Sequence, residues 1–383
     1  MDIHAAHRRR KLGFPMNLNY DLASKRIKLE SSFKLPNSTP RQEEDVWNQG
    51  ENIKTYGPLA SATISRDIIA VANEDGYINL VRKKRLSSAA HWLGHDNAIF
   101  DIKASPSGKS LLTGSGDTTI KQWDIETKEC IQQINPHYSS IKSLSFYTEH
   151  IVASGSRDGA IKVHDLRDSS PTVLVMNDAH KNKILGKKRK VKSKTDPISC
   201  VTYLVFDTDI PRLYSSGAND ATIKLWDIRK IRHKRTLDGT FVVNEPFSEV
   251  HHPSRGVHCG YSHLLLSYKR LYAACSDNKI YCYENFSSTD PIVFSGYRYD
   301  TYIRLAVMDN RFLFSGGREN GAKIWSLGTK RTKDSNEVIS REPIGELKAD
   351  DTDWCDTNVI ETDWEALSVF SFRDDGLVSK WTL

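Results

Sequence analysis

The 383-residue sequence lacks any run of about 18 apolar residues, and its N-terminus lacks the apolar stretch of a secretory signal. We therefore expect a protein that is not secreted and has no membrane partner. The six cysteines are scattered, and no two of them stand in a Cys-x-x-Cys spacing. This usage predicts reduced thiols, four of them inside strand-like runs.

A zinc site is the obvious alternative for one part of the chain. Cys259 and Cys275 have four histidines near them in the sequence: His251, His252, His258 and His263. However, the predicted strands alternate faces, and the ligand spacing of known zinc motifs is absent. We therefore predict no metal site and no cofactor.

Acidic residues are missing from one segment that is rich in bases. Eight Lys or Arg side chains stand there without an acid between them: Lys181, Lys183, Lys187, Lys188, Arg189, Lys190, Lys192 and Lys194. Without these eight, the formal charge of +6 would become −2. The positive charge is therefore concentrated in one insertion, and the rest of the chain is near neutral.

A turn residue followed by an alternating strand pattern returns seven times. The clearest copies are residues 117–124, 158–167 and 220–229, and weaker copies begin at residues 75, 277, 320 and 375. Three of the six steps, of 42, 41 and 43 residues, match the period of a WD-repeat blade, and the longer steps leave room for insertions. One such sheet cannot bury its faces alone. The sequence therefore predicts an all-β, seven-bladed propeller over residues 46–383.

The remaining segments are predicted to decorate this ring. Residues 1–45 are polar and basic and are expected to form a mostly disordered arm. In WD propellers the N-terminus usually supplies the last outer strand, for which residues 32–35 and 53–56 are both candidates. Insertions are expected at about residues 181–196, 230–256 and 328–342, and the last of these is charged and expected to be mobile.

Histidine, aspartate and tryptophan recur in positions that favour a structural tetrad. His95, Asp117 and Trp123 are expected to be linked inside the second blade through a strand hydroxyl such as Ser115. The fourth blade repeats the set with His180, Asp220 and Trp226, whereas the third has His137 and an incomplete tetrad because His164 replaces tryptophan. The tetrad explains these residues better than a catalytic triad does, so we predict no catalytic residues.

Two adjacent blades end in Asp165-Leu166-Arg167 and Asp227-Ile228-Arg229. Arginines at equivalent positions would stand side by side on the rim where the third strand of each blade ends, opposite the loops between blades. The planar guanidinium forms paired hydrogen bonds and suits a protein interface. The motif resembles the WD-x-R signature of substrate receptors that dock on the damaged-DNA-binding adaptor protein of cullin 4 ubiquitin ligases.

A broader resemblance covers about residues 54–327. Residues 56–76 resemble the first blade of the denticleless family, residues 94–101 its second-blade entry and residues 156–167 its third blade. The basic insertion and residues 275–281 also match. Members of this family are nuclear receptors that present PCNA-bound substrates to a cullin 4 ligase, such as a replication licensing factor or an inhibitor of ribonucleotide reductase.

The resemblance implies a non-catalytic adaptor, in contact with the damaged-DNA-binding protein through Asp165, Arg167, Asp227 and Arg229 and with cullin 4 indirectly. The basic insertion is expected to direct nuclear import or to contact substrate, PCNA or DNA without sequence preference. A general nuclear WD-repeat scaffold in chromatin or ribosome assembly is the alternative, and an enzyme is a third hypothesis without support in the motifs.

Overall fold

The computed structural model describes the following residues: 28–34, 57–181, 200–229, 234–235, 240–243, 245–254, 259–284, 286, 290–298, 303–317, 321–331, 337–339, 341–348, 356–363 and 365–382. This part of the chain forms strands and turns and contains no helix. In particular, none of it forms a helix that is long and apolar enough to cross a membrane.

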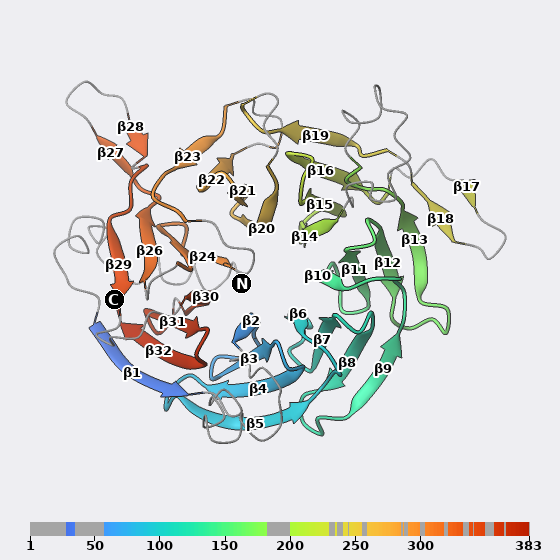
Figure 1. The fold of residues 1–383 in the computed structure, drawn as a ribbon, viewed down its shortest axis with the longest axis horizontal. Helices are drawn as coiled ribbons and strands as arrows, with labels where there is room; N and C mark the ends of the chain where they lie inside the picture. Colours follow the sequence, from blue (N-terminus) through green and yellow to red (C-terminus); the bar gives the residue numbers. More distant parts are fainter. Residues whose placement is uncertain are drawn as a thin grey trace, which may run out of the picture.

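Seven sheets are arranged radially around a common centre, as Figure 1 shows. Blade one contains β2 (Pro58–Thr63), β3 (Ile68–Asn73), β4 (Tyr77–Arg82) and β5 (Ser87–Leu93). Blade two contains β6 (Ile99–Ala104), β7 (Ser110–Ser115), β8 (Ile120–Asp124) and β9 (Cys130–Ile134). Blade three contains β10 (Ile141–Phe146), β11 (Ile151–Ser156), β12 (Ile161–Asp165) and β13 (Thr172–Met176).

The other four blades follow the same order from the centre outward. Blade four contains β14 (Val201–Phe206), β15 (Arg212–Gly217), β16 (Thr222–Asp227) and β19 (Ser248–His251). Blade five contains β20 (Tyr261–Ser267), β21 (Arg270–Cys275), β22 (Lys279–Tyr283) and β23 (Ile292–Phe294). Blade six contains β24 (Leu305–Met308), β25 (Phe312–Ser315), β26 (Gly321–Ser326) and β29 (Gly345–Lys348). Blade seven contains β30 (Thr357–Asp363), β31 (Ser368–Arg373), β32 (Leu377–Thr382) and β1 (Lys28–Lys34).

The predicted seven-bladed propeller is thus confirmed, and its ring is closed by β1. This strand pairs antiparallel with β32, with Ser32 opposite Ser379, so the N-terminal strand lies beside the last strand of the chain (Figure 1). Of the two candidate segments, residues 32–35 overlap β1, whereas residues 53–56 lie outside the described residues.

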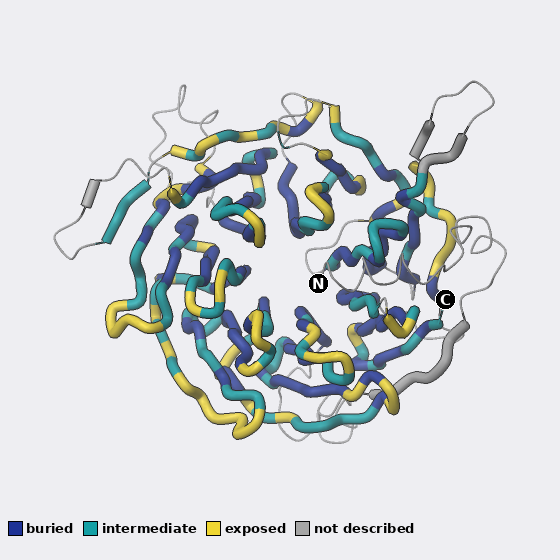
Figure 2. Tube along the Cα trace, turned by 180° about the vertical axis from the view of Figure 1, so that it is seen from behind, coloured by how far each residue is buried: buried dark blue, intermediate teal, exposed yellow. Residues whose placement is uncertain are grey.

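Apolar packing between neighbouring blades explains why the ring is stable. Among the described residues, seven buried clusters occur, one at each junction between blades. The junction of the last and first blades is among them, since Val71 and Phe370 belong to the same cluster. Burial is concentrated on the inner strands and exposure at turns and outer strands, as Figure 2 shows. Each sheet therefore buries both faces against its neighbours.

Two of the expected insertions contain regular structure. Within residues 230–256, β19 is the outer strand of blade four. The expected insertion therefore includes a strand of the blade itself. In the same segment, β18 (Phe241–Val242) pairs parallel with β13 and antiparallel with β17 (Lys234–Arg235), which extends blade three to six strands. Residues 328–342 include a ladder between β27 (Thr329–Arg331) and β28 (Glu337–Ile339).

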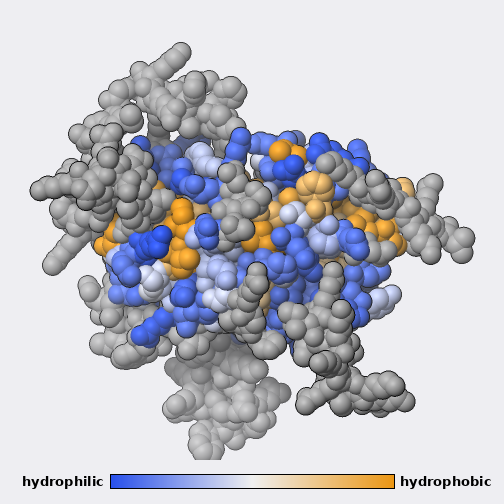
Figure 3. All heavy atoms as spheres, turned by 90° about the horizontal axis from the view of Figure 1, so that it is seen from above, coloured by the Kyte–Doolittle hydropathy of each residue, from blue (hydrophilic) through white to orange (hydrophobic). Residues whose placement is uncertain are grey.

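The ring has two faces with different loops. We call one of them the histidine face. It carries the connections between blades, with His95, His137 and His180, and the turns between the second and third strands, with Asp117, Asp158 and Asp220. The opposite, arginine face carries the hairpins between the first and second strands and the turns that follow the third strands. There, the Leu166 N–H donates to His150 O and the Ile228 N–H to Pro211 O. Seen from the side, apolar residues of the described surface gather mostly in patches along the outer wall, between hydrophilic surfaces (Figure 3).

Candidate functional site

A hydrogen-bond chain runs through the interior of blade two. The Trp123 indole N–H donates to Thr113 Oγ1 at 2.9 Å, and Thr113 and His95 Nε2 lie 2.7 Å apart. His95 Nδ1 lies 2.8 Å from Asp117 Oδ2. Burial would raise the pKa of Asp117, but hydrogen bonds from His95 and Thr119 outweigh it and lower that pKa. The ionised carboxylate only accepts, so Nδ1 of His95 donates to Asp117.

The expected hydroxyl was Ser115, and this detail is wrong. Ser115 instead donates to Asn97 O at 3.1 Å. Thr113 and Ser115 point to the same side of β7 because they are two residues apart, but the ladder pairs Leu111 with Trp123. Thr113 is therefore the hydroxyl within reach of the indole.

Blade four repeats the chain, since Trp226 and His180 both contact Ser215 Oγ at 2.8 Å and His180 Nδ1 lies 2.8 Å from Asp220. Blade three was expected to be incomplete, and the structure corrects this. His164 Nε2 lies 2.8 Å from Ser154 Oγ, in the place of the indole nitrogen, and Ser154 contacts His137 at 2.7 Å.

Burial, together with the neighbouring His137 and Lys162, lowers the pKa of His164 to about 3. The ring is thus neutral at pH 7 and has one N–H to donate, as an indole has. Asp158 completes the chain with an Oδ2–Nδ1 distance of 2.9 Å to His137. Histidine therefore replaces tryptophan without breaking the tetrad.

An aspartate, a histidine and a hydroxyl in a row resemble a catalytic triad. In blade two, however, the Thr113 hydroxyl is fully buried and holds the Trp123 indole, and the His95 side chain is also fully buried. A substrate would have no access to this oxygen. These chains fasten the inter-blade loop to the blade and are structural.

The two rim arginines are held by their own aspartates on the arginine face. Arg167 Nε and Nη2 donate to the two carboxylate oxygens of Asp165 at 2.9 and 2.6 Å. Arg229 makes the same paired contact with Asp227 at 3.2 and 3.1 Å. The side chains of Arg167 and Arg229 nevertheless remain 64% and 55% exposed.

The shared geometry begins in the backbone. In each motif the arginine N–H also donates to the aspartate, at 3.1 Å for Arg167 and 3.0 Å for Arg229. The hydrogen bond with Arg167 lowers the pKa of Asp165 to about 2, and the bond with Asp227 raises the pKa of Arg229. Asp165 is therefore an ionised acceptor, and paired hydrogen bonds fix both guanidinium groups.

The basic insertion opens on the histidine face. His180 precedes it and Cys200 follows it, and the carbonyl of Cys200 accepts from the Ala218 N–H at the turn of blade four. Lys181 lies on the surface and pairs with Asp178 at 3.3 Å. The other seven cations, from Lys183 to Lys194, lie outside the described residues.

Comparison with known proteins agrees with the repeats. A model described as "Anaphase-promoting complex subunit 4 WD40 domain" matches residues 63–149, and one described as "WD domain, G-beta repeat" matches residues 186–227. The Denticleless protein homolog of Danio rerio is 30% identical over 355 residues, which cover 85% of this chain and 51% of that protein. The Homo sapiens homolog is 31% identical over 300 residues, with coverage of 71% and 40%. Protein lethal(2)denticleless of Drosophila melanogaster is 29% identical over 371 residues, with coverage of 85% and 46%.

The chain belongs to the denticleless family. It spans about half the length or less of these curated relatives.

The centre of this denticleless-family ring holds a polar cavity that sequence reasoning missed. It has a volume of about 330 Å³ and lies among the innermost strands of several blades. Lys103 contacts Asp101 at 2.9 Å and Tyr203 Oη at 3.0 Å, and Arg304 donates to Phe100 O at 2.8 Å. Burial alone would lower the pKa of Lys103, but Asp101 and Tyr203 raise it. These contacts join blades two, four and six across the channel.

A second group that the sequence analysis set aside lies near the histidine face. One donor atom each from His252, Cys259 and Cys275 lies within 4.8 Å of the others. The expected separation by strand alternation does not occur, because Cys259 stands before β20 and His252 after β19. Alternation applies only inside a strand.

Proposed function

We propose that this chain is the substrate-recognition subunit of a cullin 4 ubiquitin ligase. It would act in the nucleus and present PCNA- or chromatin-associated replication and cell-cycle proteins for ubiquitination and proteasomal degradation. The observation that carries the proposal is the pair of exposed arginines, each held by a paired aspartate contact, on one face of neighbouring blades.

The arginine motifs support docking on the damaged-DNA-binding adaptor protein because they are rigid before binding. Asp165 and Asp227 use the Nε and Nη2 edge of each guanidinium, and the other edge is oriented for a partner's carboxylate or carbonyl. A fixed fork loses less conformational entropy on binding than a flexible lysine would. Two such forks on adjacent blades define a broad anchoring surface rather than a single contact.

The opposite face is then left for substrates. The basic insertion begins and ends there, and its charges suit the phosphates of DNA beside a PCNA-bound substrate or the acidic surface of a protein. In this arrangement the propeller is a non-catalytic spacer that holds the ligase on one face and the substrate on the other.

The direct test is binding of the purified chain to the purified adaptor by surface plasmon resonance. Arg167→Ala and Arg229→Ala should each weaken binding by about 30-fold, because a hydrogen-bonded interface arginine is lost, and the double variant should abolish it. We expect the larger effect from Arg229, because the side chain of Asp227 is fully buried whereas that of Asp165 is partly exposed.

Arg66→Ala is the matched control. Arg66 is also exposed, also paired with an acid, Glu365, at 3.2 Å, and lies in the hairpin between β2 and β3 on the arginine face. It should bind as the wild type does. If the double variant of Arg167 and Arg229 keeps wild-type affinity, the docking surface is elsewhere, and the scaffold alternative gains ground.

A further inference from the structure

Blade five departs from the tetrad in a way that points to a different use. Its histidine and aspartate are His252 and Asp277, but the position of the Thr113 hydroxyl is taken by Ala273, and the position of Trp123 by Tyr283. The chain from indole to hydroxyl to histidine therefore has neither of its first two members. A structural tetrad does not explain why this blade keeps its histidine.

The His252 ring is also turned round. In blades two, three and four, Nδ1 faces the aspartate and Nε2 faces the hydroxyl. In blade five, Nε2 lies 3.2 Å from Asp277 Oδ2 and 2.8 Å from Tyr281 Oη. Nδ1 instead lies 3.3 Å from Ser254 O and 3.1 Å from Ser254 N. The Ser254 N–H donates to Nδ1, and Nε2 is the ring nitrogen that faces the Asp277 carboxylate.

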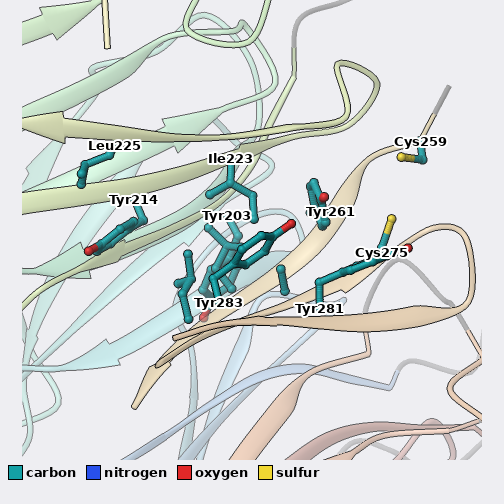
Figure 4. Packing of buried hydrophobic residues seen from close by; sticks show 12 residues of the cluster. Tyr203, Tyr214, Ile223, Leu225, Cys259, Tyr261, Cys275, Tyr281 and Tyr283 are labelled. Carbon is teal, nitrogen blue, oxygen red and sulfur yellow. The ribbon is translucent and has the colours of Figure 1, made fainter. Parts of the chain in front are cut away.

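Two thiols occupy the space beside this ring. The sulfur atoms of Cys259 and Cys275 lie within 4.8 Å of each other and of a His252 ring nitrogen. The three residues are buried, with 6% of His252, 4% of Cys259 and 0% of Cys275 exposed. Figure 4 shows the two sulfur atoms at the same end of the buried cluster, away from Tyr214 and Leu225.

We propose that His252, Cys259 and Cys275 bind a zinc ion, with the Asp277 carboxylate as the fourth ligand. Zinc prefers thiolate and imidazole ligands at about 2.3 and 2.0 Å, so neighbouring donors of a tetrahedral site lie roughly 3.3 to 3.8 Å apart. The three donor atoms already lie within 4.8 Å of one another, so small side-chain rotations bring them to this geometry.

The backbone holds the ligands in place. The His252 N–H donates to Ala221 O at 2.9 Å, and the Ala221 N–H donates to Cys259 O at 3.0 Å. Ala221 therefore anchors both ends of the segment that leads from blade four to blade five. A metal bound here would fasten the outer strand of blade four to the second strand of blade five, on the histidine face.

The test uses the full chain, purified under reducing conditions and stripped of metal. Titration with Zn²⁺ should give one ion per chain, and Co²⁺ should give the thiolate charge-transfer and tetrahedral d–d absorption bands of a site with two sulfur ligands. Cys259→Ser, Cys275→Ser and His252→Ala should each weaken Zn²⁺ binding by about 100-fold or more, because a ligand is lost. Zn²⁺ should also raise the Tm of the wild type and leave that of these variants unchanged.

Cys282→Ser is the control, because Cys282 is buried in β22 of the same blade and is not one of the three donors. It should bind Zn²⁺ as the wild type does. If a ligand variant does not fold, the Co²⁺ spectrum of the wild type decides: absence of thiolate charge-transfer bands overturns the proposal. A wild type that takes up no Zn²⁺ but loses two free thiols on mild oxidation also overturns it, in favour of a Cys259–Cys275 disulfide.

Discussion

Replacing Thr113 by valine isolates the contribution of one buried hydroxyl. The two side chains have nearly the same shape, so the change removes the oxygen and leaves little cavity. In the wild type this oxygen accepts from the Trp123 indole at 2.9 Å and contacts His95 Nε2 at 2.7 Å. In the variant, both nitrogens are buried without a partner.

Each unsatisfied buried group costs about 1 to 3 kcal/mol, so the free energy of unfolding should fall by about 2 to 6 kcal/mol. A chain of 383 residues has an unfolding entropy of about 0.8 kcal/mol per kelvin. The expected fall in Tm is therefore about 3 to 8 °C, which differential scanning calorimetry resolves. Thr127→Val is the control: its hydroxyl is exposed and accepts from Glu129 N at 3.3 Å, so the Tm should move by about 1 °C or less.

A double variant distinguishes the hydrogen-bond chain from a local packing effect. Trp123→Phe removes the indole N–H, so in the Thr113→Val background it no longer leaves a buried donor unsatisfied. The double variant should lose less stability than the sum of the two single variants. If Thr113→Val lowers the Tm no more than Thr127→Val does, or if the two changes in blade two are additive, the chain does not carry the stability we assign to it.

Three further outcomes are expected. The pKa of His164 is about 3 in the folded state and about 6.5 in the unfolded state, so the unfolded state binds more protons below pH 6.5 and the free energy of unfolding falls with acidification. Between pH 7 and pH 5 the wild type should lose about 2 kcal/mol more than His164→Gln, as measured by urea denaturation, and equal losses would contradict this. A reporter fused to residues 181–194 should enter the nucleus, and a cytoplasmic reporter would leave import to another segment. Changing the basic residues of 187–192 to Gln, with an unrelated nuclear signal added, should weaken capture of a DNA-loaded substrate. For the wild type, the logarithm of the DNA affinity should fall with the logarithm of the salt concentration at a slope of about −4 to −7. If the variant degrades its substrates at the wild-type rate, the segment serves only in targeting.

The seven repeats could be predicted from the sequence because each one carries its own turn and strand signal. The same local signal could not choose between Thr113 and Ser115, which share a side of β7. Only the ladder between β7 and β8 places Thr113 beside Trp123. The part played by His164 in the tetrad of blade three could not be predicted for a related reason. The repeat pattern specifies tryptophan at this position, whereas the hydrogen-bond chain needs only a buried N–H there.

Contacts between distant segments were beyond reach of local patterns. The pairing of β18 with β13 joins residues 67 apart in the sequence, and neither strand's sequence specifies the other. The approach of His252, Cys259 and Cys275 depends on how the chain crosses from blade four to blade five. Alternation predicts faces within a strand and says nothing of residues that flank it.

The pairing of β1 with β32 has a consequence for how the protein is made. During synthesis the strand at residues 28–34 leaves the ribosome long before residues 377–382 exist, so its partner is absent while the other blades assemble. Until then β1 and the incomplete seventh blade expose unpaired strand edges, and an unpaired edge is a template for another chain. A ribosome that stalls within the last repeat would therefore release an open ring prone to aggregation, although nearly all of its core residues had already been translated.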